Sequence, residues 1–544
     1  MLQTIISQLQ NFRNSLYELL PQRADSTMDL LDALSSNTNA DSVVKLSLNP
    51  LFRRCYSSVF DVIENFLSTK PTNSTKEAQL IAEQKEQSTH QSLMKLIGEQ
   101  CPVPTSERHF RLFGLDCTPG PRPYAEKLAD RHVTYSPNPA PGNKPIVIGH
   151  QYSTLAYLPE HQNPQAPTWV LPCSTERVPS QEKGNEWGMR QLSQYLRHPA
   201  LGWDKELSVV VGDSLYNTIN CQKIAKSHEN LVLISRLRSN RNVYAPPGSS
   251  SPNAKNNGHP TWYGQKMNLN NPEKYLPPDA RHNFTVTLAN GKTVTVTIDV
   301  WNDMRMRGTR DFRTDLYPFT LLRVQVTTAD GRPLYKHSLW LAAFGPRRKE
   351  LSPRTIYECF RQRYDLEHYF RFGKQRLLMD SFQTPSVAHE ENWWRLTQLA
   401  YIQLYLARNL AVPIPYPWER YLPEQREPSV SSPAQTLRSF PKIAGSLGTP
   451  AIASSPRGKS PGRLPGSLQP PRPDVPVLYK STKEDKGNSP KNAAKNETPG
   501  LEKTGSSLKP KSYADVMTEL QVMVQNIGMT IGEFLERTAI ELAT

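Results

Sequence analysis

Residues 360–374 read FRQRYDLEHYFRFGK, and this stretch decides both the fold and the candidate site. On an α-helix, at about 100° per residue, Arg363, Glu367 and Lys374 fall within about 60° of Phe360, on one narrow stripe. The other acids of the segment project to the opposite side: Glu358, Asp365 and Asp380. The geometry therefore selects Glu367 as the inward-facing carboxylate. The alternative is a solvated charged face with i, i+4 pairs, but such a face would not begin with an aromatic side chain.

Two further acids follow apolar runs that predict β-strands. Asp116 comes directly after Phe113-Gly114-Leu115, and Asp213 comes directly after Val209-Val210-Val211-Gly212. A carboxylate at the end of an apolar strand has a rigid support at the edge of a sheet, where α/β sheets bind their ligands. Taken alone, each acid is better explained as an ordinary aspartate before a turn.

The pattern around these acids predicts an α/β sheet covered by helices. Short β-rich runs alternate with helical patterns up to residue 239, and further strand signals follow with hairpin turns at Asn290-Gly291 and Asp330-Gly331. The expected strands are 109–115, 145–158, 168–172, 207–211, 231–237, 283–289, 292–300, 319–327 and 338–344. The expected helices are 180–196, 218–227, 352–379 and 388–410, and the first hundred residues also have helical spacing.

Composition indicates a nucleic-acid partner. The 544 residues include 65 Lys and Arg against 50 Asp and Glu, a formal charge of +15, which favours a polyanion. Residues 425–512 hold 14 Pro, 8 Gly and 15 Lys or Arg against 6 Asp or Glu, so we expect a basic, disordered tail. No run approaches the roughly 18 apolar residues of a membrane span, and no secretory signal is recognisable. We therefore expect a cytoplasmic, nucleoid-associated protein without a membrane partner.

The spacing of the decisive stretch resembles a known signature. Bacterial insertion-sequence transposases with a DDE catalytic triad on an RNase H-like fold carry Y-(2)-R-(3)-E-(6)-K, and the sequence matches it except that Phe360 replaces the tyrosine. Asp116, Asp213 and Glu367 then look like the three catalytic and metal-binding acids of that family. The long gap between the last two is where such transposases carry a β-rich insertion. The resemblance covers roughly residues 105–410.

The resemblance also implies cofactors and DNA contacts. Three converging carboxylates would repel one another without cations, and hard oxygen ligands point to two Mg²⁺ or Mn²⁺ ions for in-line phosphoryl transfer. Arg363 and Lys374 would hold phosphates near the transposon end. Phe360 can pack there but cannot donate a hydroxyl hydrogen bond.

With the resemblance, the chain divides into six expected parts around an RNase H-like mixed sheet flanked by helices. These are a helical N-terminal DNA-binding domain (1–104), the first part of the catalytic domain (105–239), a β-rich insertion (240–335), the second part of the catalytic domain (336–424), the disordered basic tail (425–512) and a C-terminal pair of short helices (513–544). The tail motif from Pro456 to Arg463 resembles a minor-groove hook, with a plain linker as the alternative.

Further DNA contacts are expected from aromatic and basic residues. Trp340 lies where related transposases stack a tryptophan on an extruded base; a core tryptophan is the equal alternative, and Trp301 is the rival candidate. One basic cluster follows the strand after Asp213, and a second lies in the insertion. The first cluster is Arg236, Arg238 and Arg241, and the second is Arg305, Arg307, Arg310 and Arg313.

The sequence therefore predicts a transposase that binds double-stranded DNA at its element ends, cleaves it, and joins the 3′-hydroxyl ends to target DNA, as a homodimer in the synaptic complex. One alternative is an RNase H-like nuclease or resolvase without strand transfer. Another is a catalytically inactive DNA-binding regulator, for which the three acids would be incidental.

Overall fold

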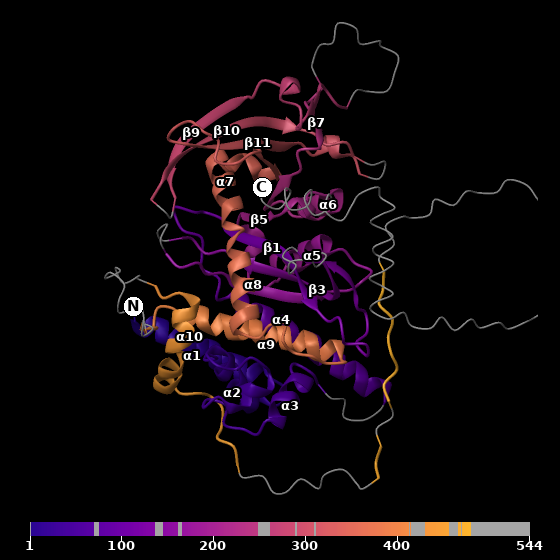
Figure 1. Cartoon of the computed structure of the whole chain (residues 1–544), viewed down its shortest axis with the longest axis vertical. Coiled ribbons are helices and arrows are strands. Elements are labelled where there is room, and N and C mark those ends of the chain that lie inside the picture. Colours follow the sequence, from indigo (N-terminus) through magenta and orange to yellow (C-terminus); the bar gives the residue numbers. More distant parts are fainter. Residues whose placement is uncertain are drawn as a thin grey trace, which may run out of the picture.

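A ten-stranded mixed sheet forms the centre of the computed structural model (Figure 1). The structure describes residues 2–69, 75–136, 145–161, 166–247, 262–288, 291–308, 312–412, 414, 430–455, 466–468 and 471–479. The sheet has the order β4-β3-β1-β5-β6-β12-β11-β10-β9, and β2 pairs with the beginning of β3. The strands are β1 (Arg111–Pro121), β2 (His132–Tyr135), β3 (Ile146–Tyr157), β4 (Leu171–Val178), β5 (Ser208–Gly212), β6 (Leu231–Leu237), β9 (Ala280–Thr287), β10 (Thr293–Met304), β11 (Phe319–Thr328) and β12 (Leu339–Phe344).

The first five strands along the sheet have the RNase H-like arrangement. Strand β3 is antiparallel to both β4 and β1, whereas β1, β5 and β6 are parallel to one another. The crossovers are α5 (Gly184–Leu196) and α6 (Ile219–Lys226). All five residues of β5 are buried, as expected for a strand covered on both faces. The predicted RNase H-like mixed sheet flanked by helices is confirmed.

Strand β12 and the strands of the insertion continue this sheet beyond its RNase H-like part. Strand β12 pairs antiparallel with β6 on one side and with β11 on the other, and β10 and β9 follow. A separate two-stranded ribbon is formed by β7 (Asn242–Tyr244) and β8 (Lys266–Asn268). Gly291 adopts φ +77°, which suits the glycine of the predicted β9–β10 turn; Asn290 lies outside the described residues.

The N-terminal helices lie at the end of the molecule opposite the insertion (Figure 1). They are α1 (Leu2–Leu19), α2 (Ala24–Ser35), α3 (Ser57–Asn65) and α4 (Lys76–Gly98). Three of them contact α9 (Val387–Ala407), and their apolar residues join the same hydrophobic core. Buried Arg13 ties α1 to the rest, with an ion pair to Asp32 and a hydrogen bond of 2.6 Å to Gln403 of α9. The helices therefore share a core with the sheet domain.

Part of the expected disordered tail is folded. Residues Pro433–Leu447 form α10, which begins with a capping box between Ser432 and Gln435 and packs on α9 and α2. Leu437 and Phe440 are buried there. The average composition of the 88-residue segment 425–512 concealed a helix with one apolar face, so the expectation of disorder is wrong for residues 433–447. The proposed hook and the C-terminal helical pair lie outside the described residues.

The long helix expected over residues 352–379 is two helices, α7 (Pro353–Gln362) and α8 (Asp365–Arg376). At the junction the amides of Arg363, Tyr364, Leu366 and Glu367 each bond to the carbonyl three residues earlier, which overwinds the backbone. Together the two helices run along the molecule from the insertion to α9 (Figure 1). In the described part of the chain, no helix is long and apolar enough to cross a membrane.

Candidate active site

Asp116 lies within β1, not at its end as the sequence suggested. The strand continues to Pro121, and Asp116 pairs with Thr154 of β3 in the sheet register. Residues 111–115 of the strand are all buried, whereas Asp116 is only half-buried. The apolar run therefore stops at Leu115 although the strand continues. Asp116 is therefore held by a central strand with neighbours on both sides.

Asp213 follows β5 directly, as expected. It is the N-cap of a short 3₁₀ turn, Ser214–Tyr216, and its Oδ1 accepts a hydrogen bond of 2.8 Å from the amide of Leu215. Because β1 and β5 are adjacent and parallel, with Gly114 opposite Val211, the two aspartates leave neighbouring strands at the same level of the sheet.

Glu367 lies in the first turn of α8, and Arg363 connects it to the sheet. One guanidinium nitrogen of Arg363 lies 3.1 Å from Oδ2 of Asp116, and the other lies 3.1 Å from Oε1 of Glu367. The two carboxylates thus converge on a single cation. Residues 116 and 367 are brought together although 250 positions separate them along the chain.

Close packing sets the position of α8 over β1. A Cβ atom at Gly114 would lie only 2.8 Å from Cδ1 of Leu366, so the glycine allows the helix to approach the strand two residues before Asp116. On its other side, Asp365 pairs with Nε2 of His161 at 2.8 Å, as expected for an acid that points away from the stripe. Gln362, the last residue of α7, also bonds to the carbonyl of Pro159. These contacts fix the helical junction that holds Arg363 and Glu367.

The electrostatics agree with convergence of all three acids. Burial raises the pKa of Asp116 to about 6; Arg363 opposes this rise, while the negative charges of Asp213 and Glu367 add to it. Burial also raises the pKa of Asp213, opposed by the Leu215 amide and by the positive charge of Arg363. Each aspartate is therefore affected by the same arginine.

The carboxylate oxygens of the site suit a hard divalent cation, and the Arg363 guanidinium lies between two of the carboxylates. As the described side chains lie, no three His, Cys, Asp or Glu residues form a cluster ready to hold a metal ion. The carboxylates of Asp116 and Glu367 instead share the guanidinium, which acts as a stand-in cation. Carboxylate oxygens are the ligands that Mg²⁺ and Mn²⁺ prefer, so a metal ion would compete with Arg363 for the same oxygens.

The remaining residues of the stripe have different environments. Lys374 donates a hydrogen bond of 2.8 Å to the carbonyl of Pro119 on β1 and lies 3.8 Å from a carboxylate oxygen of Asp380. Burial lowers the pKa of Lys374. Phe360 is half-buried and packs against the hydrophobic core.

Both tryptophans considered for base stacking are buried. Trp340 is 2% exposed and lies between Tyr275 and Trp301, with ring centroids at 5.3 and 5.7 Å. Trp301 is 3% exposed, and its indole nitrogen donates to the carbonyl of Leu276. In this conformation the alternative of a core tryptophan describes Trp340, and neither ring is open to a base.

The first basic cluster lies beside Asp213. The positive charges of Arg238 and Arg236 both oppose the rise in the pKa of Asp213, and Nε of Arg238 lies 3.4 Å from Oγ of Ser214. Arg241 is exposed and lies farther along. In the second cluster, Arg313 pairs with Asp315. Arg305 donates to the carbonyl of Trp262, Arg307 is exposed, and Arg310 lies outside the described residues.

Sequence reasoning missed two groups of residues. One is a buried ion cluster of Arg122, His150 and Glu390, whose side chains are 0% exposed. The other is a polar groove between α6 and the insertion, which includes Lys183 and Lys266. No local motif marks either group, because their members come from elements far apart in the chain.

Comparison with known proteins identifies the family of the chain. A search of curated proteins found no match. The sequence model of a family described as DDE superfamily endonuclease matches residues 15–299, a stretch that contains Asp116 and Asp213. The match ends before residues 360–374, so the signature there remains a prediction. Because the match spans more than half of the 544 residues, the chain belongs to the DDE superfamily of endonucleases.

Proposed function

We propose that the protein is a DNA transposase that binds the ends of its insertion sequence, cleaves the DNA and joins the 3′-hydroxyl ends to target DNA. As a DDE endonuclease, it is a metal-dependent nuclease with DNA as its substrate. The observation that supports the finer proposal is the convergence of Asp116 and Glu367 on Arg363, beside Asp213. Recognition of element ends by the N-terminal helices and assembly as a homodimer stay predictions.

In the proposed reaction the chain holds and orients the DNA. Two Mg²⁺ or Mn²⁺ ions held by Asp116, Asp213 and Glu367 would activate the attacking oxygen and stabilise the leaving oxygen. Arg363, once released from the carboxylates, can bind the scissile phosphate through both guanidinium nitrogens. Arg236 and Arg238, whose positive charges act on Asp213, would contact the phosphates next to it.

Strand transfer is tested with linear DNA that carries the inverted repeats flanking the reading frame, together with a plasmid target. We expect Mg²⁺-dependent cleavage beside the repeats and covalently joined donor–target products on a denaturing gel. Cleavage without joined products would contradict the transposase and leave an RNase H-like nuclease. Absence of metal-dependent cleavage on any DNA would favour the inactive regulator.

Metal binding is expected to weaken as the pH falls through about 6. Burial raises the pKa of Asp116 to about 6, and an acid with a raised pKa is ionised, and able to bind metal, only above that value. Below it, the apparent Mn²⁺ affinity should fall by about tenfold per pH unit for the one proton that must leave. Calorimetric titration with Mn²⁺ over roughly pH 5 to 8 measures this dependence.

The matched comparison uses Asp116→Asn and Glu358→Gln. The first variant should bind Mn²⁺ weakly at every pH, since it lacks the titrating ligand. Glu358 is exposed and paired with Arg354, so its variant should follow the wild-type curve. A wild-type affinity that does not change over this range would contradict the assignment of Asp116 as a metal ligand.

A further inference from the structure

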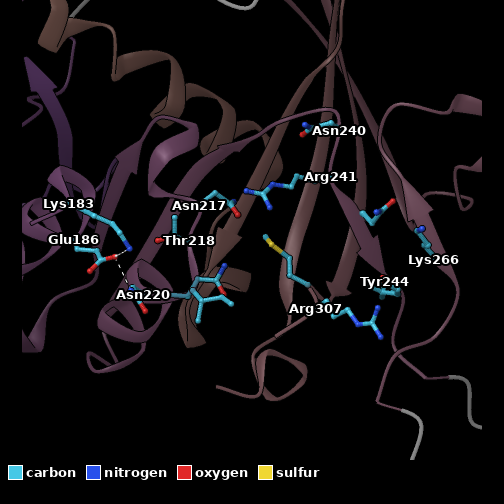
Figure 2. Close-up of a pocket in the computed structure, with 14 residues that line it drawn as sticks. Lys183, Glu186, Asn217, Thr218, Asn220, Asn240, Arg241, Tyr244, Lys266 and Arg307 are labelled. Atoms are coloured by element: carbon cyan, nitrogen blue, oxygen red, sulfur yellow. Dashed lines mark hydrogen bonds and ion pairs between the residues drawn. The ribbon is translucent and has the colours of Figure 1, made fainter. Parts of the chain in front are cut away.

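A cavity with a volume of about 650 Å³ lies between α6 and the insertion (Figure 2). One wall comes from residues 183–186 and 217–222 at the beginnings of α5 and α6. The other comes from residues 240–244, from Lys266 of β8, and from residues 306–307 after β10. We call this cavity the insertion groove. It joins the two basic clusters, because Arg241 of the first and Arg307 of the second both line it.

The insertion groove has a strong excess of positive charge. Four cations line it, Lys183, Arg241, Lys266 and Arg307, against one acid, Glu186. The acid is already satisfied, since it pairs with Lys183 at 3.2 Å and accepts a hydrogen bond of 2.8 Å from Asn220. Arg241, Lys266 and Arg307 are exposed and form no ion pair with any described residue. Three uncompensated cations around one cavity fit a ligand with several negative charges.

The groove is continuous with the turn that holds Asp213. Asn217, which lines it, is four residues beyond Asp213, and its side chain donates to Oγ of Ser235 on β6 at 2.9 Å. Strand β6 contains Arg236 and ends at Leu237, and the chain then turns through Arg238 to Arg241 in the groove wall. A chain of phosphates that passes Asp213 would therefore meet Arg241 next.

An aromatic ring and several amides complete the lining. Tyr244 is half-buried in the wall, at a ring distance of 5.2 Å from Tyr263. The backbone of Tyr244 exchanges two hydrogen bonds of 2.8 Å with the backbone of Arg305. These bonds fix the backbone position from which the ring extends. Cations that follow a backbone, combined with an aromatic ring on which a base can stack, are typical of single-strand binding.

We propose that the insertion groove binds an unpaired segment of the DNA strand adjacent to the cleaved phosphodiester, through its phosphates at Arg241, Lys266 and Arg307 and through a base at Tyr244. This inference rests on the proposed function, and it names the part of the DNA substrate that binds next to the same active site. A volume of about 650 Å³ lies within the range of about 300–1,000 Å³ for pockets that hold one small ligand. The cavity is therefore of a size for one or two nucleotides and is too small to enclose a base-paired duplex.

The first test compares two matched double variants of the full-length protein. Arg241→Ala/Lys266→Ala removes one Arg and one Lys from the groove. The control, Arg332→Ala/Lys336→Ala, removes the same pair of residue types from the loop between β11 and β12, where both side chains are exposed. This loop follows the end of the β10–β11 pairing that is opposite to Met304. Fluorescence anisotropy without divalent metal measures binding to a duplex with a single-stranded extension and to the blunt duplex of the same sequence.

The groove variant should bind the extended DNA more weakly and with a smaller salt dependence. Loss of two single-strand phosphate contacts lowers the slope of log K against log salt by about 1.4, whereas the control should keep the wild-type slope. Equal effects of the two variants, or an equal loss on extended and blunt DNA, would overturn the groove assignment. Since binding is measured without metal, that result leaves the proposed cleavage function intact; wild-type protein that binds neither DNA would overturn both.

The second test addresses the ring. Tyr244→Ala should weaken binding of the extended DNA by about fivefold to a hundredfold, the range for loss of one stacked base, while Tyr244→Phe should retain most of the affinity. Blunt duplex should bind equally to both variants. If Tyr244→Phe loses as much affinity as Tyr244→Ala, base stacking is not the role of this residue.

Discussion

Replacing Asp213 by asparagine is expected to reduce metal-dependent DNA cleavage by on the order of a thousandfold, because loss of a ligand removes several kcal/mol of metal-derived transition-state stabilisation. The variant should remain folded. The asparagine side-chain oxygen can still accept the hydrogen bond from the Leu215 amide that caps the 3₁₀ turn, and only the charge is lost. Asp116→Asn and Glu367→Gln should have effects of similar size, since all three carboxylates are proposed to serve the same ions. Initial rates of nicking on supercoiled DNA with Mg²⁺ measure the effect.

Glu358→Gln is the matched control for these variants. Glu358 lies on α7, near Glu367 in sequence, but it is about half exposed and pairs with Arg354 on the helix surface. Its variant should cleave at the wild-type rate. If Asp213→Asn retains more than about a tenth of the wild-type rate and the same dependence on Mg²⁺, the acids are not the catalytic centre, and the site must be sought elsewhere.

Much of the fold could be predicted because periodicity and burial coincide in the central strands. The apolar run Leu231–Leu237 is β6 itself, and the valine run before Asp213 is the fully buried β5. The spacing of Arg363 and Glu367 predicted that the two side chains share one face of a helix, and they do lie on the same face, 3.1 Å apart, even across the junction of α7 and α8. The catalytic roles stay predictions that the experiments above test.

Other features depend on contacts that no local pattern encodes. The helical junction at Arg363 is held by residues of the β3–β4 region, such as His161, which are about 200 positions away. Trp340 is buried because Tyr275 and Trp301 of the insertion cover it. Helix α10 is stable because α9 and α2 offer an apolar surface, which the composition of the tail cannot reveal.

Replacing Glu390 by alanine is expected to destabilise the protein by about 3–5 kcal/mol, the usual loss when one partner of a buried ion pair is removed. Glu390, near the beginning of α9, lies 2.6 Å from Nδ1 of His150 on β3 and 3.0 Å from a guanidinium nitrogen of Arg122, just after β1. The Arg122 contact is close, but its geometry is not that of a hydrogen bond, so the attraction is mainly Coulombic. Without Glu390, the charge of Arg122 would remain in the interior with no ion-pair partner among the described residues. Urea unfolding followed by tryptophan fluorescence measures the loss.

The neighbouring residue provides the control. Glu391 also pairs with an arginine, Arg177, at 2.7 Å, but it is 28% exposed and water can replace its partner. Glu391→Ala should therefore change the stability by no more than about 1 kcal/mol. Equal destabilisation by the two variants would show that burial of the ion pair does not determine the loss of stability. If only Glu390→Ala is strongly destabilising, the ion cluster is what fastens α9 to β1 and β3, and because β1 also carries Asp116, it supports the strand on which the proposed catalytic site depends.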